Sequence, residues 1–176
     1  MDAIEILRVE QQALKGMMLE IAHSMDANRK NLFAPFKREF ELHDGVKLDI
    51  FYPSIASNPK TAGLKAMDPE ARRVVANAFR NLGALPLDSK DWFPYFRAIQ
   101  GILVRQMAVE DTRVFEKVHE AFSPIILGEL GRRMVDERRR RNIDSAGLAI
   151  GVGSPAIQRS HAAPEKSAKN EGPTTF

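Results

Sequence analysis

The chain has 176 residues and a mass of 19.7 kDa, which is the size of one domain with some residues to spare. Apolar residues make up 44% and charged residues 28%, a balance that permits a buried core and argues against disorder through most of the chain. There is no cysteine, so disulfides, thiolate metal sites and cysteine nucleophiles are excluded. There are only four histidines.

The N-terminal segment is acidic and amphipathic, unlike the basic and apolar leader of a secreted protein. No apolar run approaches the roughly 20 residues needed to cross a bilayer. We therefore expect a cytoplasmic protein that does not bind membranes. The net charge is +3, and much of the basic surplus gathers in the arginines between 132 and 141.

Apolar residues at helical spacing predict a first helix over 3–25. A second stripe predicts a helix that starts around Ala34, with Pro35 in its first turn, and stops at Pro53, which has no free amide. The following stretch, 54–67, is rich in Ser, Asn, Pro and Gly and is predicted to be a connection.

Asp68, Pro69 and Glu70 predict the start of a third helix, which Gly83 ends. A long fourth helix is expected to begin near Asp88 or Ser89. Ser123 and Pro124 then cap a shorter fifth helix that ends in the arginines. From 142 onward the composition is that of a flexible tail.

No strand-like alternation, internal repeat or glycine-rich phosphate loop is visible in the sequence. Four long antiparallel helices with short links predict an all-α up-down four-helix bundle with a short fifth helix. The expected organisation is a bundle with its C-terminal helix over 1–141 and a flexible tail over 142–176.

The order of five segments resembles the bacterial hemerythrin-like domain, the HHE cation-binding family, over about 1–137. The segments are RVEQQALKGMMLEI, FELHDGVKLDIFYP, DPEARRVVANAFRNL, VRQMAVEDTRVFEKV and LGELGRRM. The resemblance implies a left-handed four-helix bundle with a non-heme di-iron centre. It also implies imidazole ligands from all four helices and two carboxylates, each one turn after a histidine. Residues i and i+4 share a helix face, so such a pair can reach one ion.

When the family's ligand positions are carried over, none of them holds a histidine in this chain. The matched positions are Gln11 after Glu10, Gly45 and Asp49, Ala71 after Glu70 with Val75 one turn on, and Gln106 and Glu110. Only Glu110 is unchanged, and Asp49 is a shortened analogue. We therefore expect that a normal di-iron site cannot form and that the chain carries no cofactor.

The remaining polar residues, Gln11, Asp49, Gln106 and Glu110, are expected to meet in one layer of the bundle. Two buried carboxylates need donors, which glutamine amides supply, so the glutamines would replace the metal as partners. A water would fill the space left by Gly45 and Ala71. The alternative is that these residues have drifted and that some of them face solvent.

The surviving histidines are not expected to replace the missing ligands. His43 lies two positions before Gly45, about 200° around the helix, and should point away from the core. His23 and His119 lie turns away from the matched positions. We interpret these three as surface or helix-end residues.

Four consecutive arginines, Arg138, Arg139, Arg140 and Arg141, are a candidate site for an anionic partner. The competing interpretation is a solvated helix end, where basic residues favour the dipole. The neighbouring Asp136 and Glu137 and the lack of aromatic residues argue against nucleic acid.

No catalytic arrangement is visible, so we do not expect an enzyme. The sequence favours a hemerythrin-like protein that has lost di-iron and oxygen binding and acts as a structural, regulatory or interaction module. Its partner would be an unidentified protein or a second copy. One alternative is iron, divalent-cation or oxygen binding by the remodelled polar set. The other is binding of an anionic partner through the arginine-rich end.

Overall fold

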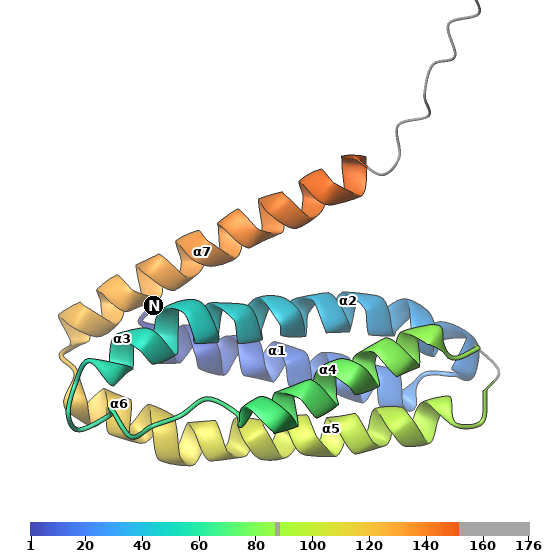
Figure 1. The fold of residues 1–176 in the computed structure, drawn as a ribbon, viewed down its shortest axis with the longest axis horizontal. Coiled ribbons are helices and arrows are strands. Elements are labelled where there is room, and N and C mark those ends of the chain that lie inside the picture. Colours follow the sequence, from blue (N-terminus) through green and yellow to red (C-terminus); the bar gives the residue numbers. More distant parts are fainter. Residues whose placement is uncertain (87–88, 152–176) are drawn as a thin grey trace, which may run out of the picture.

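The computed structural model describes residues 1–86 and 89–151, and within these ranges all regular structure is helical (Figure 1). Two of the long helical rods contain a π-helical turn, named η1 and η2. The elements are α1 (Ala3–His23), α2 (Asp26–Val46), η1 (Lys47–Phe51), α3 (Tyr52–Ala56), α4 (Pro69–Ala84), α5 (Trp92–Val109), η2 (Glu110–Phe115), α6 (Glu116–Ala121) and α7 (Pro124–Gly151). The rods run up and down, which confirms the predicted all-α bundle.

Side-chain caps mark the starts of α1 and α4. Asp2 accepts hydrogen bonds from the backbone amides of Ile4 and Glu5, and the Glu5 carboxylate accepts one from the Asp2 amide, so α1 opens with a capping box. Asp68 accepts from the backbone amides of the first turn of α4, with Pro69 as its first residue. The start predicted for the third helix is therefore confirmed.

The second rod is longer at both ends than the sequence predicts. It begins at Asp26 rather than near Ala34, because Phe33 packs in the core and holds the additional turns in place. Pro35 therefore lies inside the helix. Pro53 does not end the rod, because it sits in the first turn of α3, directly after η1, where a missing amide is tolerated.

The later helices also differ in length from the prediction. The fourth rod begins at Trp92 and continues through η2 and α6 to Ala121. The fifth helix does not stop at the arginines, because α7 continues to Gly151. The first ten residues of the predicted tail, 142–151, are therefore helical, while 152–176 lie outside the described residues.

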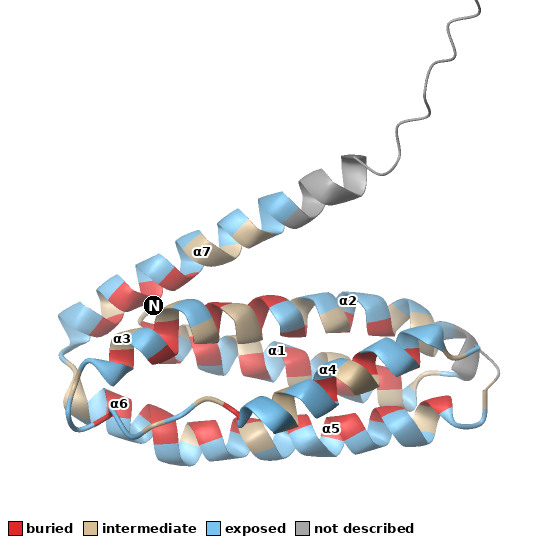
Figure 2. Cartoon of the chain, in the orientation of Figure 1, coloured by how far each residue is buried: buried red, intermediate tan, exposed pale blue. Residues whose placement is uncertain are grey.

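Two apolar clusters fill the bundle, and buried residues line the inward sides of its rods (Figure 2). Between the clusters lies a polar layer of buried residues, Gln11, His43, Lys47 and Glu110. One cluster surrounds Phe36, Phe79 and Phe96, whose rings meet edge to face. The other includes Leu7 and Phe115. Between Leu7 and Leu14, which belong to different clusters, α1 buries Gln11.

The first half of α7 packs on the end of the bundle, where Leu127, Leu130 and Met134 join the second cluster. Gly131 permits this close approach, since a Cβ there would lie 3.0 Å from the Ala3 backbone nitrogen. α7 lies on the outside of the four rods (Figure 1). Among the helices of the described ranges, none has the length and apolar character to cross a membrane.

Candidate functional site

A buried ion pair joins the second and fourth rods in the polar layer. The Lys47 ammonium donates to both carboxylate oxygens of Glu110, with Nζ 2.7 Å from Oε1 and 2.9 Å from Oε2. The side chains are 6% and 1% exposed, so both charges are withdrawn from water. Lys47 is the first residue of η1 and Glu110 the first of η2. Such π-helical turns are frequent at functional sites.

Two neutral donors complete the surroundings of Glu110. The Gln11 side-chain amide donates to Oε2 at 2.7 Å, and the Tyr52 hydroxyl donates to Oε1 at 3.0 Å. Each carboxylate oxygen thus accepts two hydrogen bonds. Because a buried carboxylate is costly without partners, these four contacts explain how the charge persists inside the bundle.

The charge of this centre shifts the pKa values of its members. Burial by itself raises the pKa of Glu110, but the Lys47 charge and hydrogen bonds, the charge of His43 when protonated, and the Tyr52 hydrogen bond outweigh burial and hold it below its usual value. Burial and the adjacent Glu110 charge raise the pKa of Tyr52. Glu110 is therefore an anion, and the Tyr52 hydroxyl remains a donor, at neutral pH.

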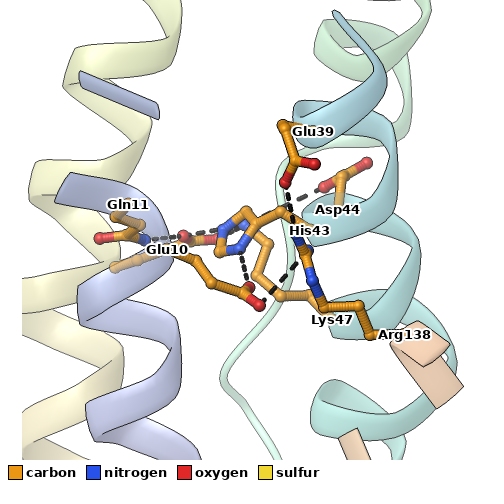
Figure 3. A network of polar contacts seen from close by, with 8 residues as sticks. Glu10, Gln11, Glu39, His43, Asp44, Lys47 and Arg138 are labelled. Atoms are coloured by element: carbon orange, nitrogen blue, oxygen red, sulfur yellow. Dashed lines mark hydrogen bonds and ion pairs between the residues drawn. The ribbon is translucent and has the colours of Figure 1, made fainter. Parts of the chain in front are cut away.

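A second polar chain runs from the core to α7 (Figure 3). His43 is 1% exposed, and its Nδ1 lies 2.7 Å from Glu10 Oε2. The other Glu10 oxygen pairs with Arg138 at 3.3 Å, and Arg138 also binds Glu39. The chain thus connects a buried imidazole with the arginines of α7.

The partners of His43 define its protonation. Burial lowers its pKa, the hydrogen bond to Glu10 partly opposes this effect, and the Lys47 charge lowers the pKa further. A neutral imidazole that donates from Nδ1 to a carboxylate carries its lone pair on Nε2. This Nε2 is buried and has no hydrogen-bond partner within the described residues.

The structure corrects the predicted ligand positions on the second rod. The inward residues one turn apart are His43 and Lys47, not Gly45 and Asp49. Asp49 has a side chain that is 60% exposed and binds Arg141 on α7. Gly45 faces the same arginine. The prediction that His43 points away from the core is therefore wrong, because its helix is in a different phase from the one assumed.

The remaining predicted positions separate into two groups. Gln11 and Glu110 lie in the polar layer and contact each other, as expected for the amide network. Gln106 is half-buried and makes no side-chain hydrogen bond within the described residues, and Ala71 packs beside the first apolar cluster. The four predicted residues Gln11, Asp49, Gln106 and Glu110 therefore do not converge as a set.

Sequence reasoning missed the two residues that matter most in the second rod. His43 and Lys47 continue the buried stripe of Phe36 and Phe40, at intervals of three and four residues. This periodicity indicates that both side chains face the core. His23 and His119 are exposed at helix ends, which confirms the interpretation given to them, and His161 lies outside the described residues.

The arginine run is largely occupied within the molecule. Arg138 binds Glu10 and Glu39, Arg140 binds Glu137 and Asp144, and Arg141 binds Asp49 and Glu137. Arg139 is exposed and makes no ion pair within the described ranges. An anionic partner would meet one uncommitted arginine there rather than four.

The residues of the polar layer do not fit a di-iron centre. Such a centre needs several neutral imidazoles and two free carboxylates, whereas the layer offers one imidazole, His43, and the Glu110 carboxylate, whose oxygens already accept four hydrogen bonds. The nearby carboxylates are also occupied, Glu10 by His43 and Arg138 and Asp44 by Arg72. Across the described part of the chain, no three His, Asp or Glu residues are grouped so that they could hold a metal ion. A lysine ammonium instead provides positive charge between the rods.

A scan against protein-family models and a search of curated protein sequences found no match. Among solved structures, the chain is similar to a hemerythrin HHE cation-binding domain-containing protein from Mycobacterium kansasii. The TM-score is 0.71 at 19% sequence identity, and the match covers 89% of this chain and 96% of that one. The arrangement of rods confirms the expected architecture: this chain has the fold of a hemerythrin HHE domain.

Proposed function

We propose that this chain is a hemerythrin-like domain in which an internal ion pair takes the place of the metal centre. The domain would act as a structural, regulatory or interaction module and not as an iron or oxygen carrier. The observation that carries the proposal is the position of Lys47. Its ammonium lies within hydrogen-bond distance of both oxygens of Glu110, the one acidic position that the family resemblance leaves unchanged.

The chemistry of the exchange supports this proposal. A carboxylate in a bundle core needs a positive charge nearby, and either a cation or an ammonium supplies it. An ammonium attached to the chain is always present, so the fold then needs no metal supply. A cation that entered would have to displace Lys47, Gln11 and Tyr52 from the Glu110 oxygens, and each displaced group would remain buried.

The alternative of cation binding through the remodelled polar set is less well supported. It required Asp49 and Glu110 on one ion, but Asp49 is exposed and binds Arg141. In the polar layer of the described chain, His43 Nε2 is the one buried nitrogen atom that has no hydrogen-bond partner and could bind a metal ion. One nitrogen beside an occupied carboxylate is a poor site for a divalent cation.

Expression with iron supplementation tests the proposal. We expect purified protein that is helical and colourless and contains far less than one iron per chain. The same preparation of the variant Glu110→Gln serves as a control, since any iron held at this position should fall with the carboxylate. Stoichiometric iron with oxo-to-iron charge-transfer bands, lost in Glu110→Gln, would contradict the proposal.

A further inference from the structure

The outward face of α5 is unusually apolar for a helix at the surface of a bundle. Figure 2 shows this helix at the edge of the molecule, with exposed residues along its outer side. Tyr95, Ile102 and Val109 follow one another at intervals of seven and are 50%, 38% and 39% exposed. Ala98, Gly101 and Ala108 lie exposed beside them. A helix with apolar residues on both its inner and outer sides is typical of one that is covered on both.

Charge is sparse on this helix. Between Asp91 and Glu110 the only charged residues are Arg97 and Arg105. The exposed side of α1, by contrast, carries Glu5, Arg8, Lys15 and Glu20 among its residues. Tyr95, Ala98, Ile102 and Val109 share one side of α5, on which the exposed Arg105 also lies, while Val104, 41% exposed, faces another side. Isolated exposed apolar residues would need no explanation, but several on one side do.

The charges at the two ends of this stripe identify its partner. Asp91 precedes Ile102 by eleven residues, and Arg113 follows it by eleven. Both are exposed, and neither side chain makes an ion pair within the described chain. If two α5 helices pack antiparallel around Ile102, Asp91 of each copy lies opposite Arg113 of the other. In the same arrangement Tyr95 lies opposite Val109.

We propose that the α5 face is a two-fold interface between two copies of this chain. Isologous dimers are the commonest assemblies, and they require a surface that is complementary to itself, as this one is. The face lies outside the Lys47–Glu110 layer, so dimer formation through α5 does not depend on whether that layer binds a metal. It assigns the apolar outer side of α5 to self-association and its flanking charges to the choice of register.

Light scattering after size-exclusion chromatography tests the interface. We expect wild-type protein at twice the chain mass of 19.7 kDa. Ile102→Glu should yield a monomer with unchanged helicity, because it buries a charge at the centre of the interface. Ile125→Glu is the matched control, since Ile125 is an 82% exposed isoleucine on α7 and its replacement should leave the dimer intact.

Charge reversal tests the register. Asp91→Arg and Arg113→Asp should each weaken the dimer by several-fold in dissociation constant, because each places like charges opposite one another. The double variant should recover the wild-type constant. A wild-type chain that remains monomeric up to about 100 µM would overturn the proposal. So would a dimer that withstands Ile102→Glu, or a double reversal that is no tighter than the single ones.

Discussion

The side chain of Arg141 lies directly over Gly45, so that a Cβ on the glycine would clash with Arg141 Nη1. This contact explains why a glycine lies inside the long helix α2, although glycine destabilises a helix interior relative to alanine. The bare backbone of α2 leaves space for the arginine of α7 to reach Asp49, one turn further on. The glycine is therefore explained by the packing of α7 against α2 and not by a metal site.

Gly45→Ala should change the free energy of unfolding differently in the wild-type and Arg141→Ala backgrounds. Alanine stabilises a helix by about 1 kcal/mol relative to glycine. In the wild-type background this gain is offset by displacement of Arg141, an exposed ion pair worth less than about 1 kcal/mol. In the Arg141→Ala background the full gain should appear in the free energy of unfolding, measured by urea denaturation. Equal effects in both backgrounds would show that Arg141 does not restrict the site.

His43 should make stability depend on pH. Its pKa is lowered in the folded protein, so the unfolded chain binds a proton more readily. The free energy of unfolding should therefore fall as the pH drops below about 6.5, by at most about 1.4 kcal/mol per pH unit. The effect should be absent above neutral pH, where both states are deprotonated.

Urea denaturation between about pH 5 and 8, the range in which histidine changes its charge, measures this contribution. His43→Gln should flatten the profile in the range below about 6.5, since glutamine does not titrate. His119→Gln, at an exposed position, is the control and should retain the wild-type profile. An unchanged slope in His43→Gln would contradict the assignment.

The two glutamines at predicted ligand positions should respond differently to replacement by leucine. Gln11→Leu removes a hydrogen bond to the buried Glu110 and should cost about 1 to 3 kcal/mol of stability. Gln106→Leu removes no hydrogen bond within the described structure and should change stability by less than about 1 kcal/mol. Thermal unfolding followed by circular dichroism separates them, and equal losses would show that the Gln11 amide is not a special partner.

The sequence was informative wherever a local pattern determined the structure. The capping residues Asp68 and Pro69 predicted the start of α4, and the apolar stripes predicted four antiparallel rods. The start of α2 was missed because no side chain caps it. α7 was predicted too short because its second half has little apolar periodicity. Pairs such as Glu137 with Arg141 and Arg140 with Asp144 support that half locally instead.

The site was harder to predict because it depends on distant partners. A lysine within an apolar stripe has no meaning until its acid is known, and Glu110 is 63 residues from Lys47 in the sequence. The family resemblance directed attention to Gly45 and Asp49, two positions too far along the helix. Gln11 and Glu110 were found correctly because the registers of their helices were read correctly.

The central claim is that the buried Lys47–Glu110 pair holds the second and fourth rods together. A double-mutant cycle of Lys47→Met, Glu110→Gln and their combination, followed by urea denaturation, tests it most directly. Each single variant strands a buried polar or charged partner and should cost about 3 to 5 kcal/mol. The double variant should lose clearly less than the sum, with a coupling energy of about 2 kcal/mol. Losses that add without coupling would contradict the account.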